Sequence, residues 1–113
     1  MRIIIGSAVF SATLHDNAAA SALKEMLPLT ISMSELNGNE KFNYLPATFP
    51  VNASTGGNIQ DGDLMLYGNN CLVLFYKSFN TSYSYTRIGR INNTSGLMKV
   101  VGKGDVTVRF ELD

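Results

Sequence analysis

The sequence contains few of the residues on which metal, redox and nucleophilic sites depend. It has a single cysteine, Cys71, which excludes an internal disulfide and any multi-cysteine metal motif. It also has a single histidine, His15, so no pair of histidines can bind a metal ion. A serine nucleophile would need His15 as its base, and no Gly-x-Ser-x-Gly motif occurs. We expect no metal or other cofactor, Cys71 as a core residue, and His15 as a surface or capping residue, with a general base as the alternative for His15.

Runs of charge of one sign and long apolar runs are also absent. Nine acidic and nine basic residues cancel, and neither sign forms a run of the kind that attracts nucleic acid or anionic lipid. No apolar run approaches the roughly 18 residues that span a bilayer. We therefore predict no nucleic-acid partner, no membrane insertion and a cytoplasmic location, with the cell envelope as the alternative if a leader has been removed from the chain.

The remaining composition is that of a small folded domain. The 113 residues are 45% hydrophobic and 16% charged, which supplies enough apolar material for one core and too little length for two. We predict one domain over residues 1–113. The opening segment is similar to a signal peptide because Arg2 precedes apolar residues, but the Gly6-Ser7 turn and the alternation from 8 to 14 predict a hairpin.

One helix is predicted, over about residues 17–27. Its apolar side chains recur at helical spacing, Asp16 or Asn17 can cap its first turn, and Pro28 cannot continue it. A short helical turn is expected near residues 95–101.

Strands account for most of the remaining sequence. Asn37-Gly38 predicts a hairpin turn, and the segment 46–62, rich in Pro, Asn, Ser, Thr and Gly, predicts a long ordered loop or a mobile flap. The segment 78–85 is predicted to connect two strands. Seven or eight short strands with few long connections indicate a mainly β fold, a closed or nearly closed barrel. The expected strands lie at about 8–14, 29–34, 41–45, 63–67, 71–77, 86–91 and 106–112.

The two most apolar strands, 63–67 and 71–77, are predicted to form the centre of the sheet. Each is apolar on both faces, which fits a strand with one face toward the barrel interior and the other under a helix. Glu40 and Lys41 bring charge to the strand that follows the Asn37-Gly38 turn. That strand is either a solvated edge of the sheet or part of the wall of a binding site.

Three segments of the chain resemble the bacterial cyclophilin-like domain family. They are LHDNAAASALKEMLPLTISMSELNGNEKFNYLP at 14–46, GDLMLYGNNCLVLFYK at 62–77 and TRIGRI at 86–91, and the likeness covers nearly the whole chain. The resemblance implies a cyclophilin-type barrel in a family that mostly lacks an assigned function. Members of this family are also linked to flavodoxin-type redox proteins, which makes a redox partner one alternative.

The resemblance does not carry over the residues of prolyl isomerisation. Cyclophilins use an arginine after a Phe-His pair, together with Phe, Met, Gln, Trp and His side chains that bind the proline. The matching region here offers Lys41 and no arginine, and the positions of the cyclophilin histidine and tryptophan fall on Tyr85 and Asn80. Met65 or Leu66 corresponds to the pocket methionine. A flexible ammonium is a poor substitute for a rigid guanidinium beside the proline nitrogen.

The sequence therefore predicts a non-catalytic binding module. The expected ligand is a peptide or a small planar or anionic molecule, held in a groove between 41–44, the 46–62 loop and 83–87. A weak prolyl isomerase is one alternative, and a structural, assembly or redox-partner domain, with a homodimer among its forms, is another. No catalytic residue is predicted, and the predicted ligand-binding residues are Glu40, Lys41, Tyr44, Met65, Tyr67, Tyr83, Tyr85 and Arg87.

Overall fold

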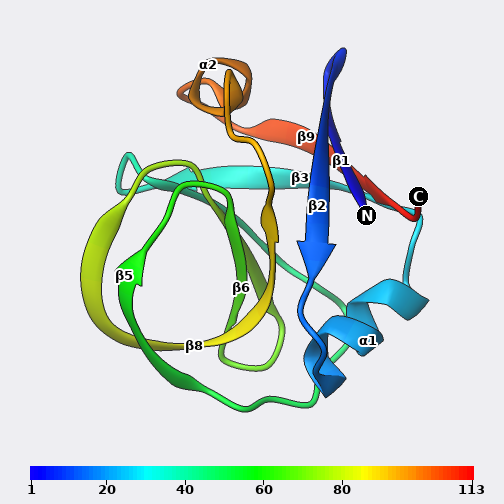
Figure 1. Cartoon of the computed structure of the whole chain (residues 1–113), viewed down its shortest axis with the longest axis vertical. Coiled ribbons are helices and arrows are strands. Elements are labelled where there is room, and N and C mark those ends of the chain that lie inside the picture. The colour runs from blue at the N-terminus through cyan, green and yellow to red at the C-terminus, as the bar shows by residue number, and fades with distance from the viewer.

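A computed structural model describes the whole chain, residues 1–113, and shows nine strands and two helices (Figure 1). All strand pairs are antiparallel. The helices are α1 (Ala18–Glu25) and α2 (Leu97–Val101). The strands are β1 (Arg2–Ile5), β2 (Ala8–Leu14), β3 (Leu29–Leu36), β4 (Glu40–Tyr44), β5 (Ser54–Ile59), β6 (Asp63–Tyr67), β7 (Cys71–Phe75), β8 (Phe79–Ile91) and β9 (Val106–Glu111).

Eight of the strands form a sheet that closes on itself. In spatial order they are β2, β1, β9, β3, β4, β7, β6 and β8, and β8 then pairs with β2 to complete the ring. In the closing pair, Leu14 lies opposite Gly89. A Cβ added to Gly89 would lie 2.6 Å from the carbonyl oxygen of Thr13, so the close approach of the two strands requires glycine. The prediction of a mainly β chain with a closed sheet is confirmed.

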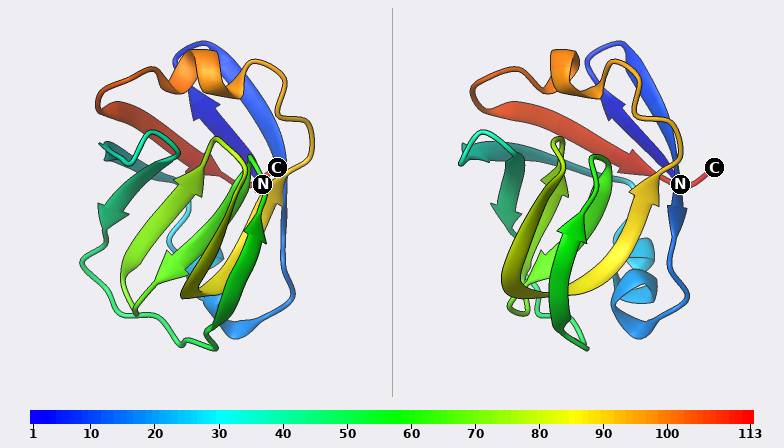
Figure 2. Two further views of the ribbon diagram at one scale, coloured as in Figure 1. Left: turned by 90° about the vertical axis from the view of Figure 1, so that its left-hand side faces the viewer. Right: turned by 60° about the vertical axis from the view of Figure 1, so that its left-hand side comes forward.

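The two helices lie at opposite ends of the ring (Figures 1 and 2). α1 begins after Asn17, whose Oδ1 accepts a hydrogen bond of 2.8 Å from the amide of Ala20, and its buried side includes Ala19 and Leu23. α2 buries Leu97 against the same core. Both predicted helical segments are confirmed, and α1 is slightly shorter than predicted.

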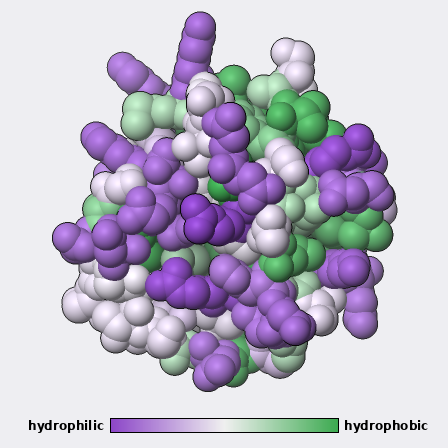
Figure 3. All heavy atoms as spheres, in the orientation of Figure 1, coloured by the Kyte–Doolittle hydropathy of each residue, from purple (hydrophilic) through white to green (hydrophobic).

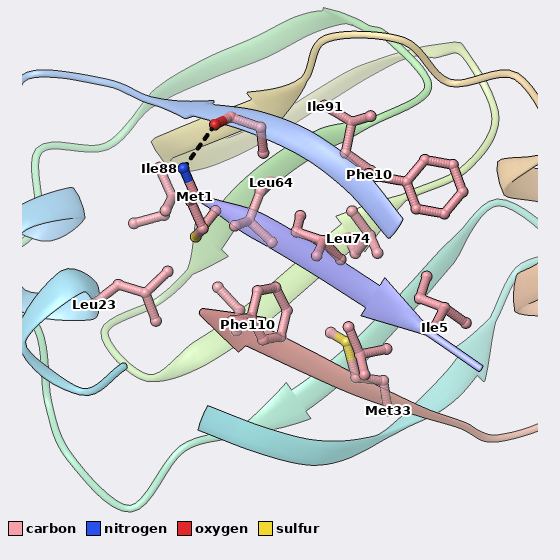
Figure 4. Close-up of a cluster of buried hydrophobic side chains, with 14 of the residues drawn as sticks. Met1, Ile5, Phe10, Leu23, Met33, Leu64, Leu74, Ile88, Ile91 and Phe110 are labelled. Atoms are coloured by element: carbon pink, nitrogen blue, oxygen red, sulfur yellow. Dashed lines mark hydrogen bonds between the residues drawn. The ribbon is translucent and has the colours of Figure 1, made fainter. Parts of the chain in front are cut away.

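The ring encloses the main hydrophobic core (Figure 4). The amino group of Met1 donates a hydrogen bond of 3.1 Å to the carbonyl oxygen of Ala12 and lies 3.0 Å from the carboxylate of Asp113, so the two ends of the chain lie side by side. Burial of apolar side chains is the main term that stabilises a closed sheet of this size. The core residues labelled in Figure 4 are Met1, Ile5, Phe10, Leu23, Met33, Leu64, Leu74, Ile88, Ile91 and Phe110.

Two predicted hairpin turns are present in the structure. Gly6, between β1 and β2, has a φ of 61°. Asn37 and Gly38, between β3 and β4, have φ values of 57° and 69°, the left-handed conformation that hairpin turns favour and that Asn and Gly tolerate best. The amide of Gly38 also donates a hydrogen bond of 2.7 Å to the carboxylate of Glu35, which fixes the turn to β3.

The largest difference from the sequence prediction is the ninth strand. Ser54–Ile59, predicted as a loop or mobile flap, forms β5, which pairs with Phe79–Tyr85 of β8. The segment 78–85, predicted as a connection, is therefore mostly strand, and β8 continues without a break to Ile91. We call β5 together with Phe79–Tyr85 the outer ribbon. It stands beside the ring and forms the left side of the molecule in Figure 1.

The outer ribbon covers the outward face of β6 and β7. The prediction that a helix covers this face is therefore wrong, because neither α1 nor α2 contributes to the cluster of side chains packed there. Cys71 is 4% exposed within this cluster, as expected for a core residue. The cluster consists of Ile59, Met65, Cys71, Val73, Phe75 and Tyr85, with Phe42 and Phe79 packed against it.

The strand β4 is not an edge of the sheet. It pairs with β3 on one side and with β7 on the other. Glu40 is 7% exposed and the side chain of Lys41 is fully buried. The alternative that these charged residues belong to a solvated edge strand is therefore wrong.

The surface seen in the orientation of Figure 1 is mostly polar, and its hydrophobic patches are separated by hydrophilic side chains (Figure 3). Neither helix has the length and apolar character needed to cross a bilayer.

Candidate binding pocket

A pocket of about 320 Å³ lies between the outward face of β4 and β7 and the inner side of the outer ribbon. The left-hand view of Figure 2 looks onto the side of the molecule that carries this ribbon. Four of the five tyrosines of the chain line the pocket, and we therefore call it the tyrosine pocket. Its lining residues are Leu36, Asn37, Asn39, Glu40, Phe42, Tyr44, Tyr67, Cys71, Val73, Phe79, Thr81, Tyr83 and Tyr85.

One wall and the floor of the pocket follow from the alternation of β4 and β7. Successive side chains of a strand point to opposite faces, so Glu40, Phe42 and Tyr44 share the outward face of β4. Phe42 lies opposite Val73 and Tyr44 lies opposite Cys71 in the adjacent strand β7. The polar Glu40 is thereby placed on the same surface as a row of aromatic and aliphatic side chains.

The other wall is built from the aromatic residues of the outer ribbon and the end of β6. The ring centroids of Tyr67 and Tyr83 are 6.3 Å apart, and those of Tyr67 and Tyr85 are 5.7 Å apart. Tyr85 also packs edge-on against Phe75 at 5.5 Å, and Phe75 contacts Phe79 at the same distance. These tilted and edge-on contacts are the favourable geometries for aromatic pairs, so the wall is formed before any ligand arrives.

The pocket is open at its rim and closed at its base. Tyr44 and Tyr83 are each 64% exposed, and Tyr67 is 48% exposed. Glu40 and Tyr85, by contrast, are almost fully buried. A ligand would therefore enter between exposed phenol rings and meet a buried carboxyl group.

The electrostatics of the pocket are set by Glu40. Burial, and to a smaller extent the negative charge of Glu35, raises the pKa of Glu40 from its ordinary 4.5 to about 7. Burial, with the charge of Glu40 as the next cause, also raises the pKa of Tyr85 to about 12 and raises the pKa of the Cys71 thiol. Near neutral pH these phenol and thiol groups are uncharged, and the carboxyl of Glu40 is divided between its charged and uncharged forms.

Lys41 lies on the other face of β4 and does not reach the pocket. Its Nζ donates hydrogen bonds of 2.9 Å and 2.5 Å to the carbonyl oxygens of Gly102 and Gly104, and it lies 3.0 Å from a carboxylate oxygen of Glu35. The ring of Tyr76 lies 5.4 Å from the same ammonium. These contacts join β4 to the segment that follows α2, so the ammonium group of Lys41 has a structural role in the fold.

Glu35 connects this lysine to the hydroxyl of Tyr76. Burial alone would raise the pKa of Glu35, but hydrogen bonds from Tyr76 at 2.7 Å, from Lys41 and from the amide of Gly38 lower it overall. Burial of the Tyr76 hydroxyl and its hydrogen bond to Glu35 raise the pKa of Tyr76 to about 12. The cluster therefore joins Lys41 to a carboxylate whose pKa is lowered and to a phenol whose pKa is raised.

Arg87 and Met65 also lie outside the lining of the pocket. An Nη of Arg87 donates a hydrogen bond of 3.2 Å to the carbonyl oxygen of Gly56, which ties β8 to β5. Met65 is 1% exposed and lies opposite Arg87, within the cluster beneath the outer ribbon.

Five of the eight predicted ligand-binding residues thus line one pocket, namely Glu40, Tyr44, Tyr67, Tyr83 and Tyr85, and three do not. The groove was predicted to include the 46–62 loop, but no residue of that segment lines the pocket. Lining residues that the sequence did not indicate include Phe42, which shares the outward face of β4 with Glu40 and Tyr44, and Cys71, which lies opposite Tyr44 in β7. Alternation along β4 could have identified Phe42 from Glu40 and Tyr44.

No three His, Cys, Asp or Glu side chains lie together as a metal site would require.

Comparisons with known proteins support the fold described above. No curated protein and no solved structure matches the chain. The model of the Cyclophilin-like family, however, matches residues 3–111, which is nearly the whole chain. The chain therefore belongs to the Cyclophilin-like family.

Proposed function

We propose that the chain is a non-catalytic binding module that takes a peptide side chain or a small molecule in the tyrosine pocket. The observation that carries this proposal is the pocket itself, whose aromatic walls are held by paired strands on both sides. A volume of about 320 Å³ lies at the lower end of the range of ligand sites. Such a site suits one side chain or a molecule of similar size.

Prolyl isomerisation is the weaker candidate for this surface. A catalyst of that reaction has to present a hydrogen-bond donor to the proline nitrogen as the amide twists. The ammonium of Lys41 is fully buried and bound to backbone carbonyls, and a guanidinium nitrogen of Arg87 is bound to Gly56. Neither group lines the tyrosine pocket. We expect no acceleration of cis/trans exchange in an X-Pro test peptide, measured by exchange NMR with a high concentration of the protein.

An assembly role is the second candidate, because the pocket rim exposes apolar surface. Leu36 is 41% exposed beside the exposed rings of Tyr44 and Tyr83. Exposed apolar groups of this kind are common at protein interfaces. If the rim is an interface between two copies, light scattering will give the mass of a dimer, and Tyr83→Ser will return it to that of a monomer. A redox-partner role has no such observation in its favour.

The binding proposal can be tested with a variant that fills the pocket. Thr81 lines the inner side of the outer ribbon, whereas the adjacent Asn80 is exposed and outside the lining. The isotope-labelled chain would be titrated with phenethylamine, phenethyl alcohol, phenylacetate and capped Gly-Lys-Gly and Gly-Pro-Gly tripeptides, following amide shifts. We expect at least one probe to give saturable shifts in 36–44 and 79–85, which Thr81→Trp abolishes and Asn80→Trp retains. Saturable shifts confined to other segments, or no shifts at all, would reject the proposal.

A further inference from the structure

The charges around the tyrosine pocket differ from those expected of an anion-binding site. Glu40 is the only Asp, Glu, Lys, Arg or His among the lining residues. The two cationic side chains that were predicted to lie there, Lys41 and Arg87, are engaged elsewhere with backbone carbonyls. An anionic ligand would therefore meet a carboxylate of its own sign with no positive group to offset the repulsion.

The carboxyl of Glu40 has no partner within the chain. Its side chain makes no hydrogen bond and no ion pair, although the residue is 7% exposed. A carboxylate that is largely removed from water and has no protein donor is unfavourable, and natural proteins normally pair such groups. The amide oxygen of Asn39, the residue before it, is fully buried without a hydrogen-bond partner, whereas the carboxyl oxygens of Glu40 keep some contact with solvent. Both groups belong to the pocket lining, so the base of the pocket holds acceptors that need a donor.

The walls of the pocket present the second feature that favours a cation. Phe42, Tyr44, Tyr67, Phe79, Tyr83 and Tyr85 all line it. The faces of aromatic rings carry negative electrostatic potential, and several rings around one space attract ammonium and guanidinium groups. The pocket volume corresponds to about ten water molecules, which leaves room for an alkyl or aryl group beside the charged end.

We propose that the ligand of the tyrosine pocket is an organic cation, an ammonium or guanidinium group whose N–H donors bind the Glu40 carboxylate while its carbon chain packs among the aromatic rings. This inference rests on the proposed binding function and specifies its ligand class. Two sources share this chemistry, a small free amine and the side chain of a lysine or arginine in a peptide. An organic cation thus takes the place of the planar or anionic ligand expected from the sequence.

The proposal implies that binding strengthens as the pH rises. Because the pKa of Glu40 is raised to about 7, part of the carboxyl is protonated near neutral pH. A cation binds the ionised carboxylate, so its affinity rises as the pH rises and the carboxyl loses its proton. Tyr44, Tyr67 and Tyr83 share the pocket lining with Glu40. The groups coupled electrostatically to Glu40 are Glu35 on β3, Cys71 on β7, Tyr76 just after β7, and Tyr85 on β8. Of these, only Glu35 is charged near neutral pH, and its negative charge opposes ionisation of Glu40.

The test compares charged and uncharged probes of one shape. Phenethylamine, phenethyl alcohol and phenylacetate would be titrated into the isotope-labelled chain, and capped Gly-Lys-Gly and Gly-norleucine-Gly would form the peptide arm. We expect the amine or the lysine peptide to shift amides in 36–44 and 79–85, and the neutral and anionic probes to bind at least about 10-fold more weakly. A response to the free amine alone identifies a small-molecule site, and a tighter response to the lysine peptide identifies a peptide site.

Variants separate this inference from the binding function on which it depends. Glu40→Gln keeps the shape of the side chain and should weaken amine binding at least about 10-fold, whereas Glu25→Gln, an exposed change on α1, should leave it unaltered. Affinity of the unaltered chain should rise between about pH 5.5 and about pH 8.5, and that of Glu40→Gln should stay constant. If pocket amides respond to phenylacetate or phenethyl alcohol as strongly as to the amine, or if Glu40→Gln binds the amine unchanged, the cation inference is wrong while the pocket remains a binding site. If no probe shifts these amides, both proposals fail.

Discussion

Glu40 and Lys41 are adjacent in the sequence and have their side chains on opposite faces of β4. The carboxyl of Glu40 faces the tyrosine pocket without a partner, and the ammonium of Lys41 is bound to two carbonyls and a carboxylate on the other face. These two ionisable side chains, adjacent in the sequence, therefore differ in their hydrogen-bond partners. One is satisfied by the fold, and the other is available to a ligand.

Replacing Lys41 should destabilise the fold without changing the pocket directly. Lys41→Met would remove the donors to Gly102 and Gly104 and leave Glu35 without its cation. Loss of a buried donor from partners that stay buried costs about 1–3 kcal/mol of the free energy of unfolding. Urea denaturation followed by circular dichroism would measure this loss. Lys99→Met, at an exposed position on α2, is the matched control and should change stability by less than about 0.5 kcal/mol. Equal stability of the two variants would mean that the contacts of Lys41 carry no net energy.

The raised pKa of Glu40 should make its burial increasingly unfavourable as the pH rises. In the folded chain the group binds its proton more tightly than in the unfolded chain, so its contribution to stability is fully present below about pH 4.5 and is lost as the pH rises through about 7. The full shift corresponds to at most about 3 kcal/mol, and solvent at the open pocket reduces it to about 1–2 kcal/mol.

Glu40→Gln removes this dependence, so its stability relative to the unaltered chain should increase between about pH 4.5 and about pH 7.5 and then level off. Denaturant titrations at a series of pH values would show the effect, with Glu25→Gln as the control on an exposed site. A difference between Glu40→Gln and the unaltered chain that does not vary with pH would show that Glu40 is ionised normally in the folded state.

The close approach of β2 and β8 predicts a severe effect of one methyl group at Gly89. Its Cβ would lie 2.6 Å from the carbonyl oxygen of Thr13 and 3.2 Å from the Cα of Leu14, both backbone atoms that cannot rotate away. We expect Gly89→Ala to lower the free energy of unfolding by about 1–3 kcal/mol. Gly104→Ala, where no atom lies within 4 Å of an added Cβ, should change it by a few tenths at most. Thermal unfolding of the two variants in parallel would decide the matter, since comparable melting temperatures would mean that the strands can separate at no cost.

The tyrosines of the pocket should report ligand binding by their own fluorescence. The chain has no tryptophan, and only Tyr76 among its five tyrosines lies outside the pocket lining. A ligand that displaces water from the phenol rings should therefore change the emission of the chain in a saturable way. We expect Tyr76→Phe to keep this response and Tyr67→Phe to reduce it. A response that depends on Tyr76 would place the ligand elsewhere.

Sequence periodicity predicted most of the ring but not the outer ribbon. The continuous apolar runs of β6 and β7, the alternation of apolar residues in β9 and the Asn37-Gly38 turn identify those elements directly. β5 contains Gly56, Gly57 and Asn58, residues with little preference for strands, and it forms because its backbone pairs with β8. That pairing joins segments separated by a buried hairpin, which local propensity does not reveal.

The candidate site could also be predicted only in part from the sequence. Tyr67 stands out at the end of a predicted strand, and Tyr83 and Tyr85 stand out in the segment predicted to connect two strands; all three meet in one pocket. Alternation could also have separated Glu40 from Lys41, since neighbours on a strand face opposite ways. It could not show which face is enclosed by the ring, because that depends on the pairing of β4 with β7.

The strand β8 belongs both to the ring and to the wall of the tyrosine pocket, so ligand binding is coupled to the stability of the whole chain. Its later half completes the ring against β2, and its first half, in the outer ribbon, forms a wall of the tyrosine pocket. A ligand held by that wall stabilises the folded chain by mass action, by about 1.4 kcal/mol at ten times its dissociation constant. Melting temperature thus offers an unbiased screen for ligands, in which compounds are ranked by how far they raise it before any binding site is assumed.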